Sequence, residues 1–115
     1  MPLLPQAHWL VAGLGNPGPE YAGTRHNVGF AVVEALAGAA RSSFRPGPKC
    51  SRVVPVRLAG VPVLLLQPLT YMNLSGEPVA ACLSALRLPA DRLMVVHDDL
   101  DLALGRLKVV AEAGP

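Results

Sequence analysis

Apolar residues occur along this chain in runs whose spacing alternates between the periods of strands and helices. Residues 9–14 form a short apolar run that ends near glycine, which is typical of a buried strand leading into a loop. From residue 28 to residue 40 the apolar side chains recur at helical spacing, and Thr24 or Asn27 is available as the N-cap. The chain therefore begins with a predicted strand, a loop and a helix.

The middle of the chain predicts a β-hairpin, because residues 53–58 and 61–66 flank the turn residues Ala59-Gly60. Pro55 cannot donate a backbone hydrogen bond, so we expect the first of these strands to lie at a sheet edge. In the second strand, residues 64–66 are consecutive leucines, as in a strand covered on both faces. The preceding segment 41–49, with its serines, prolines and glycine, is expected to be a loop.

The last third of the chain predicts one more helix and two more strands. Ser75 can cap a helix over residues 76–86, in which Pro78 is tolerated within the first turn. Residues 93–96 and 106–110 have strand-like composition. The resulting order β-α-β-β-α-β-β predicts one α/β domain over residues 1–115, with three layers (α/β/α) and a mixed, mostly parallel sheet.

Bulk composition narrows the function classes. The 115 residues carry a net charge of +2, which is too small to identify a nucleic-acid-binding protein by itself. Cys50 and Cys82 have no zinc-site spacing, and two reduced thiols are expected. No secretory signal precedes Gly13, and the longest apolar run is too short to cross a bilayer. We therefore expect a cytoplasmic protein with no membrane partner.

Polar residues gather in three clusters, at 16–27, 70–75 and 97–101, each of which follows a predicted strand. Reactive groups in α/β sheets collect where the carboxyl ends of strands enter loops. We therefore expect the three clusters to meet at one edge of the sheet.

The first cluster begins with Gly13-x-Gly15-x-x-Gly18, which formally matches a dinucleotide-binding fingerprint. Prolines and other loop residues separate these glycines from the helical pattern, so nucleotide binding is only a minor alternative. His26 either helps to cap the helix or acts as a general base, oriented by Asp98. Since no serine or cysteine stands in a nucleophile context, attack by an activated water is expected.

The other two clusters also allow two interpretations each. Asn73 either bonds its own backbone, or its amide polarises a carbonyl group or holds the attacking water. The acidic residues Asp98, Asp99 and Asp101 lack the remaining spacing of a calcium loop, which leaves a metal site as a minor alternative.

Taken together, the three clusters resemble bacterial-type peptidyl-tRNA hydrolases. The matching segments are GLGNPGPEYAGTRHNVGF, TYMNLSG and HDDLDL, in this order and at fitting spacing. The resemblance extends from Trp9 to about Lys108. Members of this family hydrolyse the ester between a peptide and the 3′ end of tRNA, which recycles tRNA from abandoned translation. They are monomers that need no metal or cofactor, and the expected location is the cytoplasm, with an organelle as the alternative.

The resemblance implies specific roles for individual residues. The catalytic group would comprise His26 as the base, Asp98 as its orienting carboxylate and Asn73 as the residue that positions water or the scissile carbonyl. Substrate-binding residues would be Asn16 at the 3′-terminal nucleotide, Tyr21 along the cleft, Met72 at its floor and Asn27 supporting the histidine loop. The tRNA phosphates would contact Arg106 and Lys108, although weakly.

The chain departs from the family pattern at its C-terminal end. Family members continue into a glycine-rich segment with a His-Asn pair, further strands and a terminal helix, whereas this chain stops at Pro115. We expect a domain that is incomplete at this end, with an exposed sheet edge that promotes self-association. Two hypotheses follow. The first is a hydrolase, either as a fragment of a complete enzyme or as a short form of reduced activity, and the second is a catalytically inert RNA-binding or vestigial form.

Overall fold

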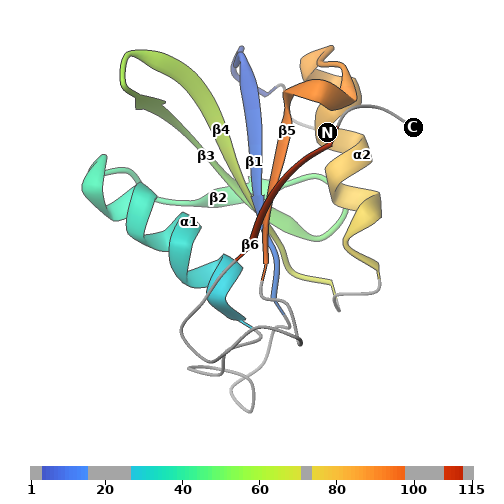
Figure 1. Cartoon of the computed structure of the whole chain (residues 1–115), viewed down its shortest axis with the longest axis horizontal. Coiled ribbons are helices and arrows are strands. Elements are labelled where there is room, and N and C mark those ends of the chain that lie inside the picture. The colour runs from blue at the N-terminus through green and yellow to red at the C-terminus, as the bar shows by residue number, and fades with distance from the viewer. Residues whose placement is uncertain (1–3, 16–26, 71–73, 98–107, 113–115) are drawn as a thin grey trace.

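The computed structural model describes residues 4–15, 27–70, 74–97 and 108–112, the last of these as backbone only. Within these ranges two α-helices and a short 3₁₀ helix accompany six strands, which form one sheet in the order β2-β3-β4-β1-β5-β6 (Figure 1). The elements in chain order are β1 (Trp9–Gly13), α1 (Val28–Ala39), β2 (Arg45–Gly47), β3 (Ser51–Leu58), β4 (Val61–Pro68), α2 (Gly76–Leu86), η4 (Ala90–Arg92), β5 (Leu93–His97) and β6 (Lys108–Glu112).

The sheet is mixed, with parallel pairing at its centre. Strand β1 pairs in parallel with β4 on one side and with β5 on the other. The pairings β2–β3, β3–β4 and β5–β6 are antiparallel. Consequently β2, β4, β1 and β5 run in one direction, while β3 and β6 run in the other. The predicted α/β class with a mixed sheet is confirmed, but parallel pairing is not in the majority, since two of the five pairings of the described strands are parallel and three are antiparallel.

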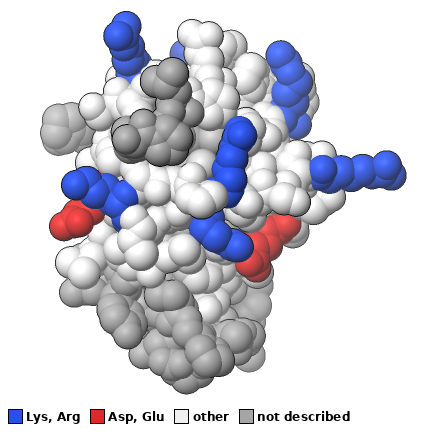
Figure 2. Space-filling model, turned by 180° about the vertical axis from the view of Figure 1, so that it is seen from behind, with Lys and Arg blue, Asp and Glu red and all other residues white. Residues whose placement is uncertain are grey.

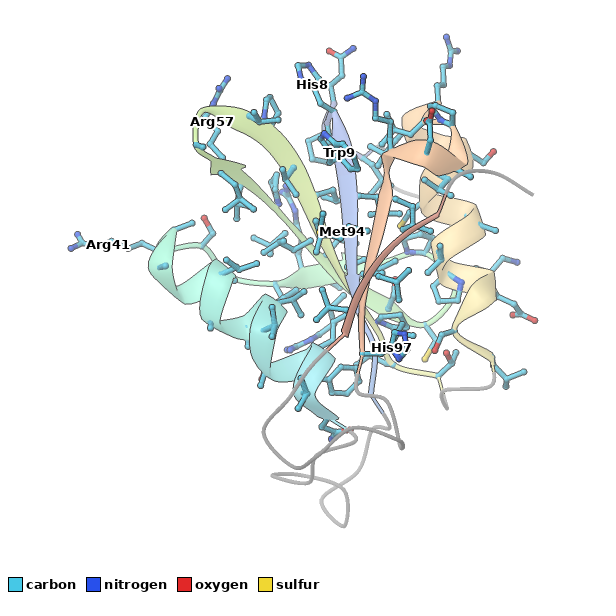
Figure 3. The ribbon with its side chains drawn as sticks, viewed as in Figure 1. His8, Trp9, Arg41, Arg57, Met94 and His97 are labelled. Carbon is cyan, nitrogen blue, oxygen red and sulfur yellow. The ribbon has the colours of Figure 1, made fainter. Side chains whose placement is uncertain are left out.

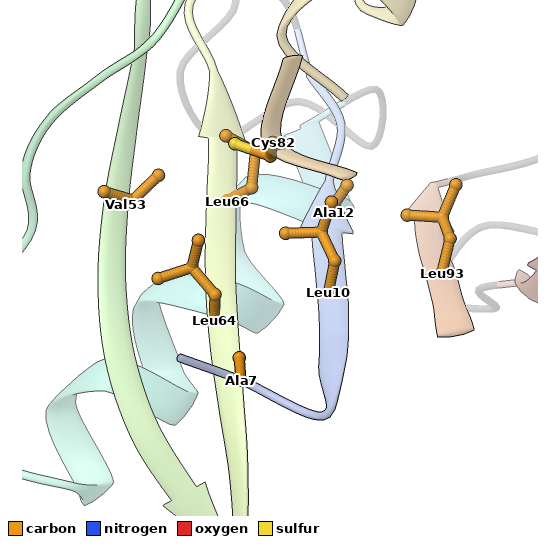
Figure 4. Close-up of a cluster of buried hydrophobic side chains, with 8 residues drawn as sticks. All are labelled: Ala7, Leu10, Ala12, Val53, Leu64, Leu66, Cys82 and Leu93. Carbon is orange, nitrogen blue, oxygen red and sulfur yellow. The ribbon is translucent and has the colours of Figure 1, made fainter. Parts of the chain in front are cut away.

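The two helices cover opposite faces of the sheet, which confirms the predicted three layers. On one face Val33 and Ala37 of α1 pack with Val11, Val54 and Leu65. On the other face Cys82 of α2 packs against Leu10, Leu64 and Leu66 (Figure 4). The three consecutive leucines of β4 are fully buried, because their alternating side chains meet a different helix layer on each face.

The hairpin prediction is confirmed, but the prediction that its first strand lies at a sheet edge is wrong. Strand β3 lies between β4 and the short strand β2, which occupies part of the segment predicted to be a loop. Strand β2 pairs only with Ser51–Val53. Farther along β3, at Pro55, no strand of the described chain pairs on the outer side. Proline is tolerated there because the sheet needs no outward backbone donor at that position.

The helix boundaries lie within one residue of those predicted, although neither cap forms as expected. Asn27 and Ser75 occupy the N-cap positions of α1 and α2, and neither side chain makes a capping hydrogen bond. The alternative cap, Thr24, lies outside the described residues. The final strand begins at Lys108, two residues later than predicted.

Candidate functional site

The carboxyl ends of three neighbouring strands define one edge of the sheet. Strands β4, β1 and β5 are adjacent and parallel, so their last residues, Pro68, Gly13 and His97, lie side by side at this edge (Figure 1). The three predicted polar clusters begin immediately after these strands. The described residues that lead into the clusters are therefore brought together, as the sequence predicted.

Most of the predicted site residues lie outside the described residues. Among those described, Asn27 is half-buried at the start of α1, and Lys108 begins β6, where its backbone lies opposite His97. The predicted residues outside the described ranges are Asn16, Tyr21, His26, Met72, Asn73, Asp98 and Arg106.

The first helix begins directly on the ends of β1 and β5, in a contact that only glycine permits. The Leu14 N–H donates a hydrogen bond to the Val96 carbonyl at 2.9 Å. A Cβ on Gly29 would lie 2.3 Å from both the Leu14 nitrogen and the Val96 oxygen. A Cβ on Gly13 would lie 2.2 Å from the Gly29 oxygen. The helix backbone therefore rests against the two strand ends without any intervening side chain.

A second close contact joins Gly15, just before the first cluster, to Asn27 at its end. A Cβ on Gly15 would lie 2.7 Å from Asn27 Oδ1 and 2.9 Å from the Phe30 ring. Because α1 begins only at Val28, well beyond Gly18, the helix does not open at the glycines as a dinucleotide fingerprint requires. Gly13 and Gly15 lie in close packing contacts, which accounts for these two glycines without a nucleotide.

Two buried hydroxyl groups border the second cluster. The oxygens Thr70 Oγ1 and Ser75 Oγ are both inaccessible to solvent, and neither has a hydrogen-bond partner among the described residues. A buried hydroxyl without a partner is costly. The sequence offered Ser75 as a helix cap but gave no sign that this pair would be buried.

A strained turn places a cation beside the end of β4. In the turn between β2 and β3, Lys49 and Cys50 have φ angles of 53° and 59°, a left-handed conformation that costs about 1 kcal/mol per residue. The Ser51 hydroxyl donates to the Pro48 carbonyl at 2.6 Å, and the Leu69 N–H donates to the Cys50 carbonyl at 2.9 Å. The exposed Lys49 thus lies next to the segment that leads into the second cluster. The sequence did not predict this position of Lys49.

A polar network ties α1 to the sheet close to the same edge. Arg52 donates from Nε and Nη2 to Gln67 Oε1, at 2.9 and 2.5 Å, and Gln67 Nε2 donates to Glu34 Oε2 at 3.2 Å. The Arg52 guanidinium also lies 3.5 Å from that carboxylate and 4.8 Å from the centre of the Phe44 ring. Gln67 is only 2% exposed, so this network fixes the helix that carries Asn27.

Of the two cysteines, Cys82 is a core residue and not a nucleophile. Both are free thiols, Cys50 being exposed and Cys82 buried. Burial raises the pKa of the Cys82 thiol to about 11, so this group is protonated at neutral pH and acts as a core side chain.

Two kinds of feature are absent from the described part of the chain. No group of three or more His, Cys, Asp or Glu side chains there could hold a metal ion. No helix in these ranges is long and apolar enough to cross a membrane. The acidic residues Asp98, Asp99 and Asp101 lie outside the described ranges.

A cavity of about 680 Å³ opens at the opposite end of the sheet, away from the strand carboxyl ends. Its lining includes His8 before β1, Ala40 after α1, and Arg57 and Pro62 beside the hairpin turn. This cavity is therefore separate from the edge where the three clusters begin.

Comparison with known proteins identifies relatives of this chain. A family model described as peptidyl-tRNA hydrolase matches residues 10–115. The chain is 49% identical over 106 residues to the peptidyl-tRNA hydrolase of Frankia casuarinae, an alignment that covers 92% of this chain and 54% of the relative. It is 43% identical over 109 residues to the chloroplastic peptidyl-tRNA hydrolase of Arabidopsis thaliana, covering 95% of this chain and 38% of that one.

Solved structures show the same similarity. The crystal structure of peptidyl-tRNA hydrolase from Acinetobacter baumannii superposes with a TM-score of 0.76 at 38% sequence identity, and covers 86% of this chain and 52% of that chain. The chain thus spans about half the length of most of these relatives.

Proposed function

This chain belongs to the peptidyl-tRNA hydrolase family, and from that premise we propose that it hydrolyses the ester bond between a peptide and the 3′ end of tRNA. The observation that carries the proposal is the convergence of the ends of β4, β1 and β5, from which all three family-like segments start. The contact of Asn27 with Gly15 supports it further, because the residue before Asn27 in the sequence is His26.

In the proposed reaction, His26 removes a proton from water while Asp98 holds the imidazole in the required tautomer. The resulting hydroxide attacks the ester carbonyl carbon, and the Asn73 amide donates a hydrogen bond to the developing oxyanion or holds the water. The carbon–oxygen ester bond then breaks, and the proton passes to the departing tRNA hydroxyl. The products are a peptide carboxylate and a free tRNA.

Other residues would bind the substrate. Asn16, Tyr21 and Met72 would contact the 3′-terminal nucleotide and the peptide end, while Asn27 would support the loop that carries His26. Arg106 and Lys108 would contact phosphates. The relatives include bacterial and chloroplastic proteins, so a cytoplasmic or an organellar site of action fits equally.

The test compares His26→Ala with His8→Ala in a hydrolysis assay on an N-acetylated aminoacyl-tRNA. His8 is exposed and precedes β1 at the opposite end of the sheet, so it is the matched control. We expect the first substitution to lower the rate ~100-fold or more, with tRNA binding retained, and the second to leave the rate unchanged. A His26→Ala protein that kept a tenth of the rate would overturn the assignment.

Two further outcomes separate the remaining hypotheses. A wild-type chain that binds tRNA without hydrolysing the substrate would favour the inert RNA-binding form. Since the proposed mechanism uses no metal, a chelator should leave the rate unchanged. Inhibition by the chelator that is reversed by added magnesium or zinc would instead favour the metal alternative for Asp98.

A further inference from the structure

Positive charge is concentrated in one part of the chain. Residues 41–76 contain five Lys and Arg residues and no Asp or Glu. This stretch therefore carries +5 while the whole chain carries +2, which leaves −3 for the remainder. On the face seen in Figure 2, Lys and Arg side chains are spread widely and acidic side chains are few.

We propose that the outer side of the β2–β3 hairpin binds the phosphates of an RNA strand through Arg45, Lys49 and Arg57, here called the β2–β3 basic surface. All three side chains are exposed. The surface deepens the proposed function, on which it rests, by adding a binding region outside the strand-end site.

The strand register sets the spacing of these cations. Arg45 pairs with Val53, and Arg57 follows four residues farther along β3, so their Cα atoms lie about 14 Å apart. Because Arg45 lies opposite Val53 and Arg57 is four positions after Val53, Arg45 and Arg57 belong to the same face of the sheet. Lys49 lies beyond the other end of β3, in the turn. The three cations are therefore distributed along β3, which is about 23 Å long.

The neighbouring arginines differ in what they are already bound to. The guanidinium of Arg52 is held by Gln67, Glu34 and Phe44, so we leave it out of the surface. Arg57 donates one hydrogen bond to the Gly60 carbonyl at 2.7 Å, which anchors the side chain at the hairpin turn. Its position at the end of the hairpin, pointing outward, is visible in Figure 3.

The direction of the surface fits a tRNA whose 3′ end lies at the strand-end site. Lys49 is next to that site, because the neighbouring Cys50 carbonyl accepts the hydrogen bond from Leu69. From there Arg45 and Arg57 lead away along β3 toward the hairpin turn. A nucleic-acid backbone that leaves the site in this direction would meet cations in succession, and such contacts are independent of base sequence.

An anionic membrane fits this surface less well than RNA does. Peripheral membrane binding normally combines cations with an inserted apolar face. The large apolar side chains that are exposed in the described ranges are Val61, 37% exposed at the start of β4, and Leu74 beyond the end of β4, so neither belongs to β2 or β3. Charge without an apolar face favours a phosphate backbone in water.

The test measures binding of deacylated tRNA by fluorescence anisotropy at about 50 and 200 mM salt. The test variant is Arg45→Glu with Lys49→Glu, and the control is Arg87→Glu, an exposed arginine at the end of α2. We expect the double variant to bind at least ~10-fold more weakly and to show a salt slope reduced by roughly 2. The control should stay within about twofold of the wild type, as expected for a charge outside the binding surface.

A folding control and a neutral pair keep the test decisive. Thermal unfolding by circular dichroism checks that the variants fold, and Arg45→Gln with Lys49→Gln gives the same comparison with a smaller change in charge. Unchanged tRNA binding in either folded pair would overturn the proposal. Equal losses in the pair and in Arg87→Glu would also overturn it, because they would show a general charge effect.

Two additional measurements separate this surface from its alternatives. If the substitutions abolish binding to phosphatidylserine vesicles but leave tRNA binding intact, the surface binds membranes and the proposal is wrong. If the chain hydrolyses the substrate but its tRNA binding is unchanged by these substitutions, the β2–β3 basic surface is wrong and the proposed function stands. If tRNA binding depends on the surface but the chain hydrolyses nothing, the proposed function is wrong and the surface stands.

Discussion

At the scale of single residues, the most constrained positions are glycines that touch backbone rather than glycines that turn the chain. Gly13 and Gly29 bring β1 and the start of α1 into contact, and the Val96 carbonyl of β5 completes the junction. The sequence predicts a glycine-rich turn after the first strand, but it does not reveal this contact, because the partners are far apart in the chain. A glycine inside a helical pattern, Gly29, was the available signal.

Two glycines of α1 make a matched test of that contact. Gly29→Ala should destabilise the protein by about 2–3 kcal/mol, since the added methyl group overlaps backbone atoms that cannot rotate away. Gly38→Ala should stabilise it by about 0.5–1 kcal/mol, since nothing lies within 4 Å of that position and alanine favours the helix. Urea unfolding measures both. Equal effects would show that the helix does not rest on the strand ends.

At the scale of elements, the hydrophobic pattern predicted what local spacing controls. The two helices, the hairpin and the buried leucine strand all follow from apolar periodicity and flanking turn residues. Strand β2 was missed because its three residues, Arg45–Gly47, include a proline and a glycine and have no alternation of their own. They become a strand only through pairing with β3, so the basic surface built on them could not be predicted either.

The turn of the β3–β4 hairpin supplies a prediction at this scale. Leu58 pairs with Val61, and the two residues between them, Ala59 and Gly60, have φ angles of 51° and 81°. Positive φ at both positions is the requirement of a type I′ turn, for which Asn-Gly is preferred. Ala59→Asn should therefore stabilise the protein by about 0.5–1 kcal/mol in thermal unfolding.

A control for this substitution comes from an exposed alanine of the first helix. Ala35→Asn introduces the same side chain at a helical position, where it should cost about 0.5 kcal/mol. Loss of stability in both variants would show that the hairpin turn does not hold Ala59 in the left-handed region.

At the scale of the whole molecule, the order of strands explains how one chain brings three distant segments together. The sequence predicted a meeting of the clusters from the general behaviour of α/β sheets, and the order β4-β1-β5 confirms it for the residues that lead into them. The arrangement of the reacting side chains remains a prediction. Local patterns do not specify it, because it depends on loops whose conformations arise from contacts between separate segments.

The two outer strands of the sheet differ in how well they resist pairing with another chain. Strand β2 is three residues long and contains Pro46, two features that blunt an edge. Strand β6 has five residues, and within the described chain it pairs only with β5. Among the described strands, none pairs with the outer side of β6.

We accordingly predict that the 115-residue chain self-associates through β6 and not through β2. Size-exclusion chromatography with light scattering at two protein concentrations should show a mass that rises with concentration, because pairing of exposed edges is bimolecular. Hydrogen exchange under the same conditions should show protection of β6 amides that increases with concentration, while β2 amides stay unchanged. A monodisperse monomer that unfolds sharply above ~60 °C would contradict the prediction, since it would show that the sheet is stable without a partner at its edge.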